Sequence, residues 1–452
     1  MKILLISPNT LTVPYPIYPI GLDYVAGSVA PEHEVRIADL NVVSLDALEQ
    51  QLLEYEPEVI GLSCRNIDNT EASDSLCFIN EYKKLVSWLR SRSKAILICG
   101  GSGFSIMPKK ILPALGANYG LIGEGERFGL LVDALQDGRD PLQIPGVIAA
   151  SDTAAIPEKK PPPWDGLQRR AFKREAGHNR FYLDQGGMLN LQSKRGCSFR
   201  CVYCPYPSIE GKKHRLVEPE RVADTALKLQ AAGAKYLFIT DSVFNSDIKH
   251  SLAVAKAFKT AKLTIPWGGF FAPLKLPSEY FSVMADAGLA HVEFGTESLS
   301  DSMLKNYRKP FQVRDVFNTH QQALDAGLYT AHYFLLGGPG ESVATVNESL
   351  DNREKLNKTV SFYFIGIRIY PGTTLHDIAL DEGKITAKTN LLEPVFYEPD
   401  DISRKRIDSL ITTRAEKRIN WVVGSGGSKV ANTTSKMYAR GYTGPLWEYL
   451  IR

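Results

Sequence analysis

Short apolar runs alternate with amphipathic stretches through the first 150 residues of the chain. The runs occupy residues 3–6, 35–37, 59–62, 95–99 and 119–122, and stretches such as 80–92 carry apolar residues at helical spacing. This alternation is typical of a doubly wound parallel sheet that has helices on both faces. We therefore expect a Rossmann-like α/β domain over residues 1–150, which would bind ligands beyond the carboxyl ends of its strands.

The same alternation returns with longer units from residue 186 to residue 390. Apolar runs at 188–192, 236–239, 267–272, 291–294, 331–336 and 362–369 are separated by helical patterns at 219–232, 249–262, 278–287, 313–326 and 343–356. Six such units predict a partial (β/α)6 barrel of the TIM type, whose chemistry would lie at the carboxyl ends of the strands. A proline-rich stretch at 157–163 predicts a linker over 151–185, and the mixed tail at 391–452 predicts a small helical cap.

Composition narrows the class of protein. The chain has 452 residues, 44% of them hydrophobic, and a formal net charge of +3, too small to indicate nucleic acid as a partner. No run approaches the roughly 18 apolar residues that span a bilayer, and the first residues do not resemble a secretory signal, so we expect a cytoplasmic protein. Basic residues concentrate between 158 and 180, which indicates a solvated linker or a surface for an anionic ligand.

Three cysteines are the most informative residues. Cys197, Cys201 and Cys204 stand at C-x3-C-x2-C spacing on one predicted loop after the first strand of the barrel. Three thiolates on such a loop can hold three irons of a four-iron cluster and leave the fourth iron open. A zinc site would need a fourth ligand, for which His214 is the nearest candidate, and a disulfide is not expected in this compartment.

This loop, with Tyr203 before its last cysteine, resembles that of the radical S-adenosylmethionine (radical SAM) superfamily. The resemblance implies a [4Fe-4S] cluster whose open iron binds S-adenosylmethionine, and it places Tyr203 near the adenine. The segment 292–298 resembles the motif that reaches the ribose or methionine end, and 337–341 resembles the glycine motif beside the adenine. The cofactor contacts implied by these motifs are Gly295, Glu297, Ser298, Gly337, Gly338 and Glu341, with Arg308 or Lys309 as partner of the methionine carboxylate.

A Rossmann-like domain before such a barrel resembles the cobalamin-binding subclass of this superfamily. Its glycine-lined strand ends would face the corrin, and polar groups after the third strand would meet its amides or phosphate. The residues implied are Asn9, Arg65, Asn66, Gly100, Gly101, Ser102, Gly103, Gly123 and Glu124. The D-x-H-x-x-G motif of many cobalamin domains is absent from this chain, so no histidine is expected below the cobalt.

Two alternatives use the front domain differently. Methylthiotransferases hold a second cluster on three front cysteines, and Cys64, Cys77 and Cys99 also lie in this domain, although no cysteine follows the first strand. Buried cysteines commonly act as small hydrophobes, which is the simpler interpretation. A non-catalytic cobalamin sensor would not need an open-iron cluster.

The resemblance favours methyl transfer to an unactivated carbon, or to phosphorus, by way of methylcobalamin and a 5′-deoxyadenosyl radical. A rearrangement or ring closure with the same cofactors is the main alternative. Asp241 and Tyr370, at predicted strand ends, are candidates for contact with a small-molecule or peptide substrate. An external one-electron reductant of the flavodoxin or ferredoxin class is the expected protein partner.

Overall fold

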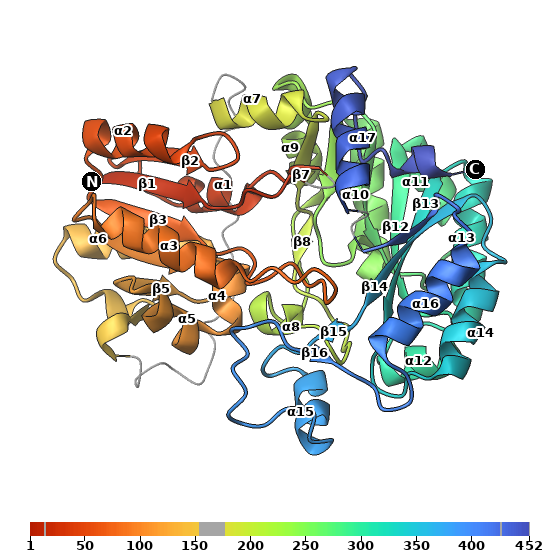
Figure 1. Ribbon diagram of the computed structural model, residues 1–452. Coiled ribbons are helices and arrows are strands. Elements are labelled where there is room, and N and C mark those ends of the chain that lie inside the picture. The colour runs from red at the N-terminus through yellow and green to blue at the C-terminus, as the bar shows by residue number, and fades with distance from the viewer. Residues whose placement is uncertain (13–14, 153–176, 425–426, 452) are drawn as a thin grey trace.

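The computed structural model describes residues 1–12, 15–152, 177–424 and 427–451 of the chain. Two large sheets organise it, one in the front domain and one in the barrel (Figure 1). Residues 153–176 of the predicted linker, which carry its basic residues except Arg180, lie outside the described residues. Arg180 lies on α7 (Gly177–Asp184).

The front sheet has the strand order β2-β1-β3-β4-β5-β6, and all neighbours are parallel except β5 and β6. Its strands are β1 (Lys2–Ser7), β2 (Glu34–Asp39), β3 (Val59–Ser63), β4 (Ile96–Gly100), β5 (Tyr119–Leu121) and β6 (Val147–Ala149). The helices are α1 (Ile20–Gly27), α2 (Leu45–Tyr55), α3 (Phe78–Arg90), α4 (Ser102–Ile106), α5 (Pro108–Leu115) and α6 (Phe128–Gln136).

Alternate side chains of β1 enter two different cores. Leu4 and Ile6 pack with residues of α2, α3 and α5, whereas Ile3 and Leu5 pack with residues of α1 and α6. Because successive side chains of a strand point to opposite faces, an almost wholly apolar strand needs helices on both sides. The doubly wound prediction is confirmed, and the order reverses at β1, which places a ligand crevice between β1 and β3.

The barrel sheet is entirely parallel and has the order β17-β14-β13-β12-β11-β10-β7. Its strands are β7 (Met188–Leu191), β10 (Tyr236–Ile239), β11 (Trp267–Phe271), β12 (Leu289–Glu297), β13 (Tyr329–Leu336), β14 (Thr359–Ile365) and β17 (Trp421–Val423). The helices that cover it are α9 (Pro219–Ala231), α10 (Ile248–Thr260), α11 (Tyr280–Asp286), α13 (Val313–Asp325), α14 (Val343–Arg353) and α16 (Arg404–Ala415).

The segment 391–452 is not the purely helical cap that we expected. It contributes α16 and α17 (Gly427–Ala439), but also β17, which pairs with β14 as a seventh strand, and β16 (Phe396–Tyr397), which pairs with β15 (Ile367–Arg368). The pattern of three residues in β17 is too short to indicate a strand without its neighbour. The barrel prediction is therefore correct in type but one strand short.

The same segment closes the amino-terminal end of the barrel. Trp447, in the short helix η5 (Trp447–Leu450), donates its indole N–H to Glu293 Oε1 at 3.0 Å, and Tyr333 donates to Glu293 Oε2 at 2.9 Å. Burial raises the pKa of Glu293. Glu448 lies 3.3 Å from the ring of His291. The lumen thus has a polar, hydrogen-bonded floor and opens toward the other end of the strands.

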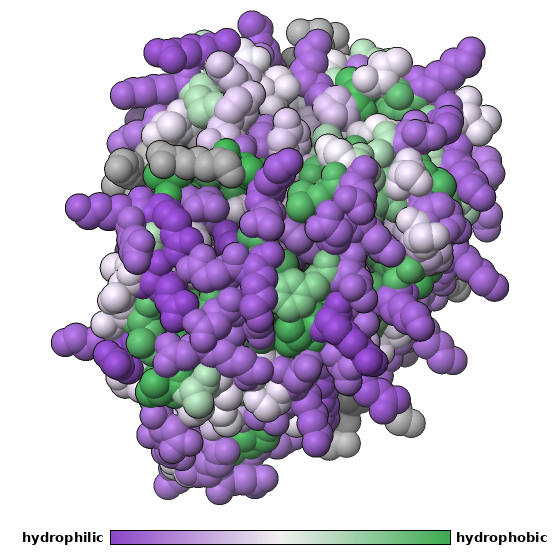
Figure 2. All heavy atoms as spheres, turned by 90° about the vertical axis from the view of Figure 1, so that its right-hand side faces the viewer, coloured by the Kyte–Doolittle hydropathy of each residue, from purple (hydrophilic) through white to green (hydrophobic). Residues whose placement is uncertain are grey.

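Buried ion pairs join the two domains. Arg368 on β15 donates to Asp68 of the front domain at 2.7 Å, and both side chains are fully buried. On the face of the barrel that is turned away from the front domain, polar side chains cover most of the surface and apolar ones form separate small groups (Figure 2). Among the helices of the described residues, none has the length and apolar character needed to cross a membrane.

Candidate active site

The cysteine loop is held by backbone contacts on both sides. It follows β7 through β8 (Lys194–Arg195), which pairs with β9 (Arg215–Leu216). Gly196 has a φ of +85°, and a Cβ there would lie 2.1 Å from the carbonyl oxygen of Lys213, so only glycine fits. Cys197 N–H donates to Gly211 O, and Val202 N–H donates to Tyr307 O. The loop is therefore fixed at both ends around its three thiols.

The three thiols influence one another electrostatically. Burial raises the pKa of Cys197, Cys201 and Cys204, that of Cys204 to about 12, and the charges of neighbouring cysteines raise the pKa of Cys201 and Cys204 further. The ammonium of Lys309 acts in the opposite direction on all three thiols. A site of this kind favours ligation of a cationic cluster, which replaces the protons and offsets the crowded negative charge.

Glu297 reaches this loop from the end of β12. The pairing of β12 with β13 shifts register between Gly295 and Glu297, and Glu297 has a φ of +56°, which is the geometry of a bulge. The bulge directs its carboxylate to Tyr203, whose hydroxyl donates at 2.7 Å, and to Lys309, whose ammonium lies 3.1 Å away. Tyr203, Gly295 and Glu297 thus meet beside the cysteine loop.

Two predicted neighbours of Glu297 lie elsewhere. Ser298 is buried and shares a hydrogen bond with Ser349, on the helix side of the sheet. Arg308 is exposed and donates to Thr374 Oγ1, whereas the adjacent Lys309 faces the thiols. The predicted cofactor contacts of Ser298 and Arg308 stay predictions, and Lys309 is the cation that faces the thiols.

The glycine motif after β13 has mainly a packing role in the described structure. A Cβ at Gly338 would lie 2.4 Å from the ring of Tyr307. Glu341 is fully buried and accepts from Gly337 N–H at 3.1 Å and from Thr345 Oγ1 at 2.6 Å, so its carboxylate braces its own turn. The predicted contact of Glu341 with the cofactor stays a prediction. In the structure Glu341 fixes the turn and accepts from the hydroxyl of Tyr307 at 3.4 Å.

Asp241 anchors the root of the cysteine loop. Its carboxylate is 1% exposed and accepts from Ser193 N–H at 2.8 Å and from the ammonium of Lys194 at 3.0 Å. Tyr370 lies over Arg368, with its hydroxyl 3.5 Å from Asp68. Neither side chain lines the cavity described next, and their predicted contact with substrate stays a prediction.

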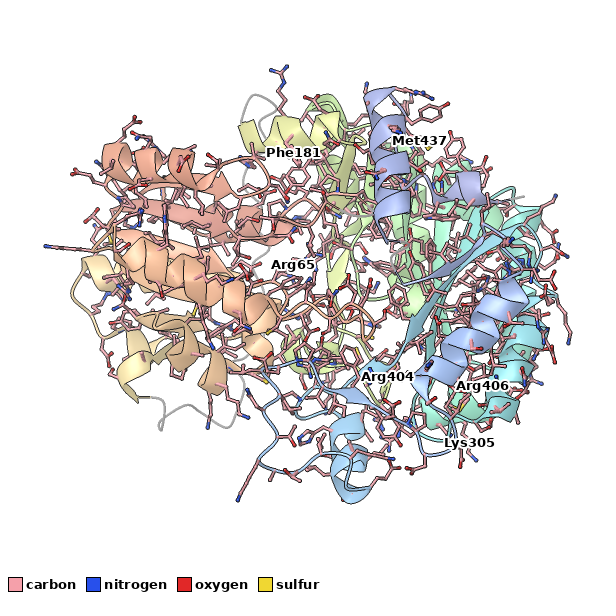
Figure 3. The ribbon with its side chains drawn as sticks, in the orientation of Figure 1. Arg65, Phe181, Lys305, Arg404, Arg406 and Met437 are labelled. Atoms are coloured by element: carbon pink, nitrogen blue, oxygen red, sulfur yellow. The ribbon has the colours of Figure 1, made fainter. Side chains whose placement is uncertain are left out.

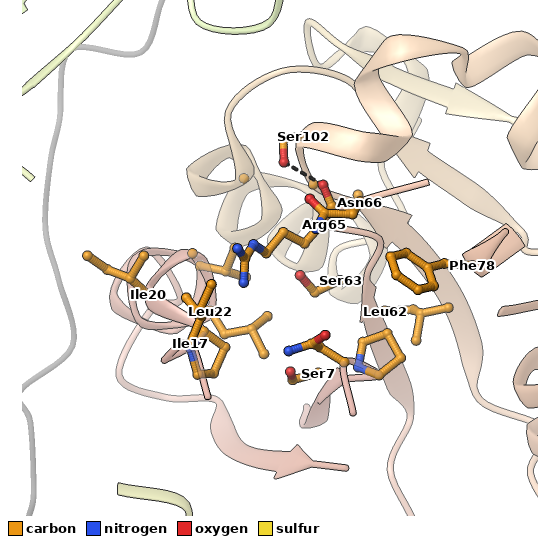
Figure 4. A pocket seen from close by; sticks show the side chains of 18 of the residues that line it. Ser7, Ile17, Ile20, Leu22, Leu62, Ser63, Arg65, Asn66, Phe78 and Ser102 are labelled. Carbon is orange, nitrogen blue, oxygen red and sulfur yellow. Dashed lines mark hydrogen bonds between the residues drawn. The ribbon is translucent and has the colours of Figure 1, made fainter. Parts of the chain in front are cut away.

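A cavity of about 1340 Å³ lies between the carboxyl ends of the front strands and the barrel. Figure 4 shows its front wall, where Arg65 extends toward Ile20 and Leu22, and Figure 3 places Arg65 between the two domains. The predicted residues that line it are Asn9, Arg65, Asn66, Gly100, Gly101, Ser102, Gly123 and Glu124. The crevice deduced from the strand order is thus the place where they converge.

Three of the residues predicted for the front domain also have close contacts within the protein. Gly103 does not line the cavity, because its Cα faces the backbone of the loop after β3, where a Cβ would lie 2.8 Å from Cys64 O. Gly101 meets the same carbonyl on its Cβ side and also lines the cavity. Glu124 lines the cavity but is committed to ion pairs with Arg195 and Arg215.

Sequence reasoning missed the barrel wall of this cavity. It consists of Asn190, Gln192, Arg195, Tyr206, Ile209, Glu210, Phe238, Thr240 and Phe270. The polar Asn190 and Gln192, alternating with apolar residues in a buried strand, were the available signal. Phe238 and Phe270 gave none, because an aromatic residue in a strand does not reveal which face it occupies.

The residues fit the implied cofactors. The cavity exceeds the roughly 300–1000 Å³ of ordinary small-ligand pockets, as a corrin with a second ligand requires, and three thiols face one another on one loop. Among the described residues, no group of three or more His, Cys, Asp or Glu side chains is arranged around a single metal ion. The thiolates of a multi-iron cluster each bind a different iron, so they lie farther apart than the ligands of one ion. His214 bonds to Ser246, not to the thiols.

Two of the three front cysteines are core residues. Cys64 and Cys99 are fully buried in an apolar cluster, and burial raises the pKa of both thiols, that of Cys99 to about 12. Cys77 precedes α3 and donates to Leu392 O at 3.5 Å. Cys64 and Cys99 lie near each other in the core, whereas Cys77 is half-buried and lines the cavity. These positions give no support to a second cluster held by all three.

Comparison with known proteins agrees with this geometry. Residues 191–352 match the radical SAM superfamily and residues 6–129 match the B12 binding domain. The chain is 26% identical over 437 residues to tryptophan 2-C-methyltransferase of Streptomyces laurentii, covering 81% of this chain and 72% of the relative. It is 23% identical over 465 residues to cytidylyl-2-hydroxyethylphosphonate methyltransferase of Streptomyces wedmorensis, covering 88% and 85%.

A solved structure has the same fold along nearly the whole chain. The radical S-adenosylmethionine methyltransferase TsrM from Kitasatospora setae, with tryptophan and an S-adenosylmethionine analogue bound, superposes with a TM-score of 0.87 at 22% identity and covers 99% of this chain and 97% of that one. With a B12 binding domain followed by a radical SAM domain around one cavity, the chain belongs to the cobalamin-dependent radical SAM family.

Proposed function

We propose that this protein is a methyltransferase that transfers a methyl group from S-adenosylmethionine to an unactivated carbon of a small aromatic molecule. One observation carries the proposal: a single cavity has the strand ends of the B12 binding domain as one wall and the barrel strands β7, β10 and β11 as the other. A methyl carrier and its acceptor can therefore meet inside one enclosure. When bound, the cluster, S-adenosylmethionine and cobalamin supply the electron, the methyl group and its carrier.

The chain's own residues position these groups. Cys197, Cys201 and Cys204 would hold the cluster, and Glu297, with Tyr203 and Lys309, offers a fixed carboxylate and ammonium beside it. The glycine-lined turns at 100–101 and 123 let the front backbone approach the corrin closely. Holding reacting groups within about 3–3.5 Å of each other in a closed site supplies much of the catalysis.

The substrate class is supported by the barrel wall. The side chain of Phe270 is unusually open for a barrel strand, at 39% exposure of the residue, and its ring lies 5.0 Å from Phe238 and 6.3 Å from Tyr333 in edge-on geometry. Asn190, Gln192 and Thr240 add polar groups beside these rings. The wall would therefore accept a planar ring that has a polar edge, and the tryptophan methyltransferase relatives are consistent with such a substrate.

Electron delivery is consistent with the shape of the cysteine loop. Ser198 and Arg200, between its first two cysteines, are exposed, while Cys197 is buried. The outer side of the loop is thus accessible to a one-electron donor of the flavodoxin or ferredoxin class, and the inner side faces the barrel.

The test is an anaerobic reaction of reconstituted protein with methyl-deuterated S-adenosylmethionine and tryptophan, followed by a panel of indoles and other small aromatic molecules. We expect S-adenosylhomocysteine together with a product that carries the deuterated methyl group. Formation of 5′-deoxyadenosine and product without S-adenosylhomocysteine would contradict methyl transfer and favour a rearrangement. Cys201→Ser is the control for the dependence on the cluster.

The substrate class has its own test. Phe270→Leu should raise the KM for the aromatic acceptor by up to about tenfold, since one aromatic contact contributes about 0.5–1.5 kcal/mol. Phe317→Leu, on the outward helix α13, is the matched control and should leave KM unchanged. Equal KM values for the wild type and Phe270→Leu would remove the aromatic wall from substrate recognition.

A further inference from the structure

Arg195 is a buried charge at the junction of the two domains. It lies on β8, two residues before Cys197, lines the cavity and is 7% exposed. Its guanidinium lies 2.7 Å from Glu126 Oε1 and 3.5 Å from Glu124 Oε1, and its Nε donates to Gln192 Oε1 at 3.0 Å. The group also lies over the ring of Tyr24, 4.9 Å from its centre. Arg195 therefore contacts the front domain through three side chains.

A second arginine doubles the connection. Arg215, on the partner strand β9, forms an ion pair with Glu124 and donates to Glu210 O at 2.8 Å. Two arginines of the β8–β9 hairpin thus meet two glutamates of the 123–126 turn, and the four side chains are at most 18% exposed. Arginine presents its donors in a rigid planar fork, so such contacts fix orientation as well as distance.

Both ends of this ionic cluster belong to a cofactor site. Gly123 and Glu124 line the cavity at the carboxyl end of β5, where the corrin would lie. The hairpin continues through Gly196 directly into Cys197, and the Gly196 N–H donates to the Glu210 carboxylate at 3.3 Å. A displacement of the turn is therefore transmitted to the cysteine loop through side chains that have little freedom to move.

We propose that Arg195 is a positioning residue that fixes the cluster loop relative to the corrin site by joining Glu124 and Glu126 to the root of the loop. A buried ion pair contributes little net stability compared with an apolar replacement, so stability alone does not account for four buried charges here. The inference rests on the two cofactor sites of the family, and it does not depend on methyl transfer being the reaction.

The test measures the distance between the two metal centres. Wild type, Arg195→Gln, Arg195→Lys and Arg414→Gln are reconstituted with iron, sulfide and hydroxocobalamin, and reduced until the cob(II)alamin and the cluster are both paramagnetic. The microwave-power saturation of the cob(II)alamin signal then reports how strongly the nearby cluster relaxes it. Arg414 forms an exposed ion pair with Asp351 and is the matched control.

We expect Arg195→Gln to keep the iron and cobalt content of the wild type but to lose much of the relaxation enhancement. Turnover should fall by about 10²-fold in kcat, the usual effect of a displacement of about 1 Å, with a smaller change in KM. Arg195→Lys, which keeps the charge but not the fork, should recover part of both values, and Arg414→Gln should match the wild type.

Wild-type relaxation in Arg195→Gln, with only a lower melting temperature, would overturn the proposal. If Arg195→Gln loses iron, the same measurement is made on the double variant Arg195→Gln/Glu126→Gln. Removing both partners leaves less uncompensated buried charge than removing one. The double variant should bind both metals and still show weakened relaxation, and wild-type relaxation in it would overturn the proposal. Because the readout needs no methyl acceptor, failure here is distinct from failure of the proposed reaction.

Discussion

The chain contains two sets of three cysteines, one in each domain, and the two sets lie in different surroundings. Burial raises thiol pKa values in both sets. Cys197, Cys201 and Cys204 share one loop and lie near the ammonium of Lys309, whereas Cys64 and Cys99 pack in an apolar core, with no cation among the causes of their pKa shifts. Spacing along the chain and one neighbouring positive charge therefore distinguish the proposed cluster ligands from the cysteines of the front core.

The strongest test of this comparison is to substitute one cysteine of each set. Cys201→Ser should abolish retention of the cluster, because two thiolates cannot hold it, whereas Cys99→Ala should keep about four irons per chain. Iron and sulfide content after anaerobic reconstitution measures both. If the wild type instead held more than four irons per chain and Cys99→Ala lost about half of them, our interpretation would be wrong. That result would favour a second cluster in the front domain.

The barrel cysteines differ from the front cysteines in a second way, because Asp241 fixes the start of their loop by its ion pair with Lys194. Asp241→Asn leaves the ammonium of Lys194 buried without its counter-charge, so we expect a loss of about 3–5 kcal/mol in the free energy of unfolding. Urea unfolding of the apoprotein measures it. Asp351→Asn, which breaks only the exposed pair with Arg414, should cost less than about 1 kcal/mol. Equal losses in the two variants would show that the anchor is unimportant.

Acid should affect the barrel through two buried histidines. His332 shares hydrogen bonds with Thr296 at 2.7 Å and His320 at 3.1 Å, and burial lowers both pKa values, that of His320 to about 4. The unfolded chain, with a histidine pKa of about 6.5, binds more protons in this interval than the folded one. Stability should therefore fall as pH drops from about 6.5 toward 4, by about 2 kcal/mol from His320 alone between pH 7 and 5.

Urea unfolding at several pH values tests this expectation. His320→Gln should flatten the dependence of unfolding free energy on pH, while His376→Gln, on α15 (Thr374–Asp381), should leave it unchanged. Parallel curves for the wild type and His320→Gln would mean that this pair does not carry the acid sensitivity.

The smallest expected effect concerns Lys309. Lys309→Met removes the cation that opposes the effect of burial on the thiol pKa values, so cluster assembly should slow by a few fold, and Lys309→Arg should restore most of the rate. The growth of cluster absorbance during reconstitution measures it. An unchanged rate would leave spacing alone as the difference between the two sets of cysteines.

The sequence allowed the doubly wound sheet, the barrel and the cysteine loop to be predicted, because each depends on local patterns of apolar or thiol residues. It did not show which polar residues near the strand ends brace the fold and which ones face the site. Ser298, Glu341 and Asp241 satisfy buried backbone and side-chain groups of the fold, while Glu297 reaches the site through a bulge that no local pattern indicates. A polar residue that braces a turn has the same sequence signature as one that binds a ligand.

Ion pairs and strand pairs between residues far apart in the sequence could not be predicted either. Glu124 and Glu126 follow a glycine turn that favoured a ligand, and only the folded chain shows that Arg195 and Arg215 occupy their carboxylates. The strand β17 is defined by its pairing with β14 and not by its three residues.

The floor of the barrel has a consequence for the order of events on the ribosome. The strands of the front sheet have all been made by residue 149, whereas the apolar core on one of its faces also includes residues between Val202 and Tyr397. The lumen needs Trp447 on Glu293 and the Gly444 N–H on Gly186 O. Domains fold as units, in order, while the chain is synthesised. The nascent chain therefore gains the front strands first, the remaining residues of their core later and the floor of the barrel last.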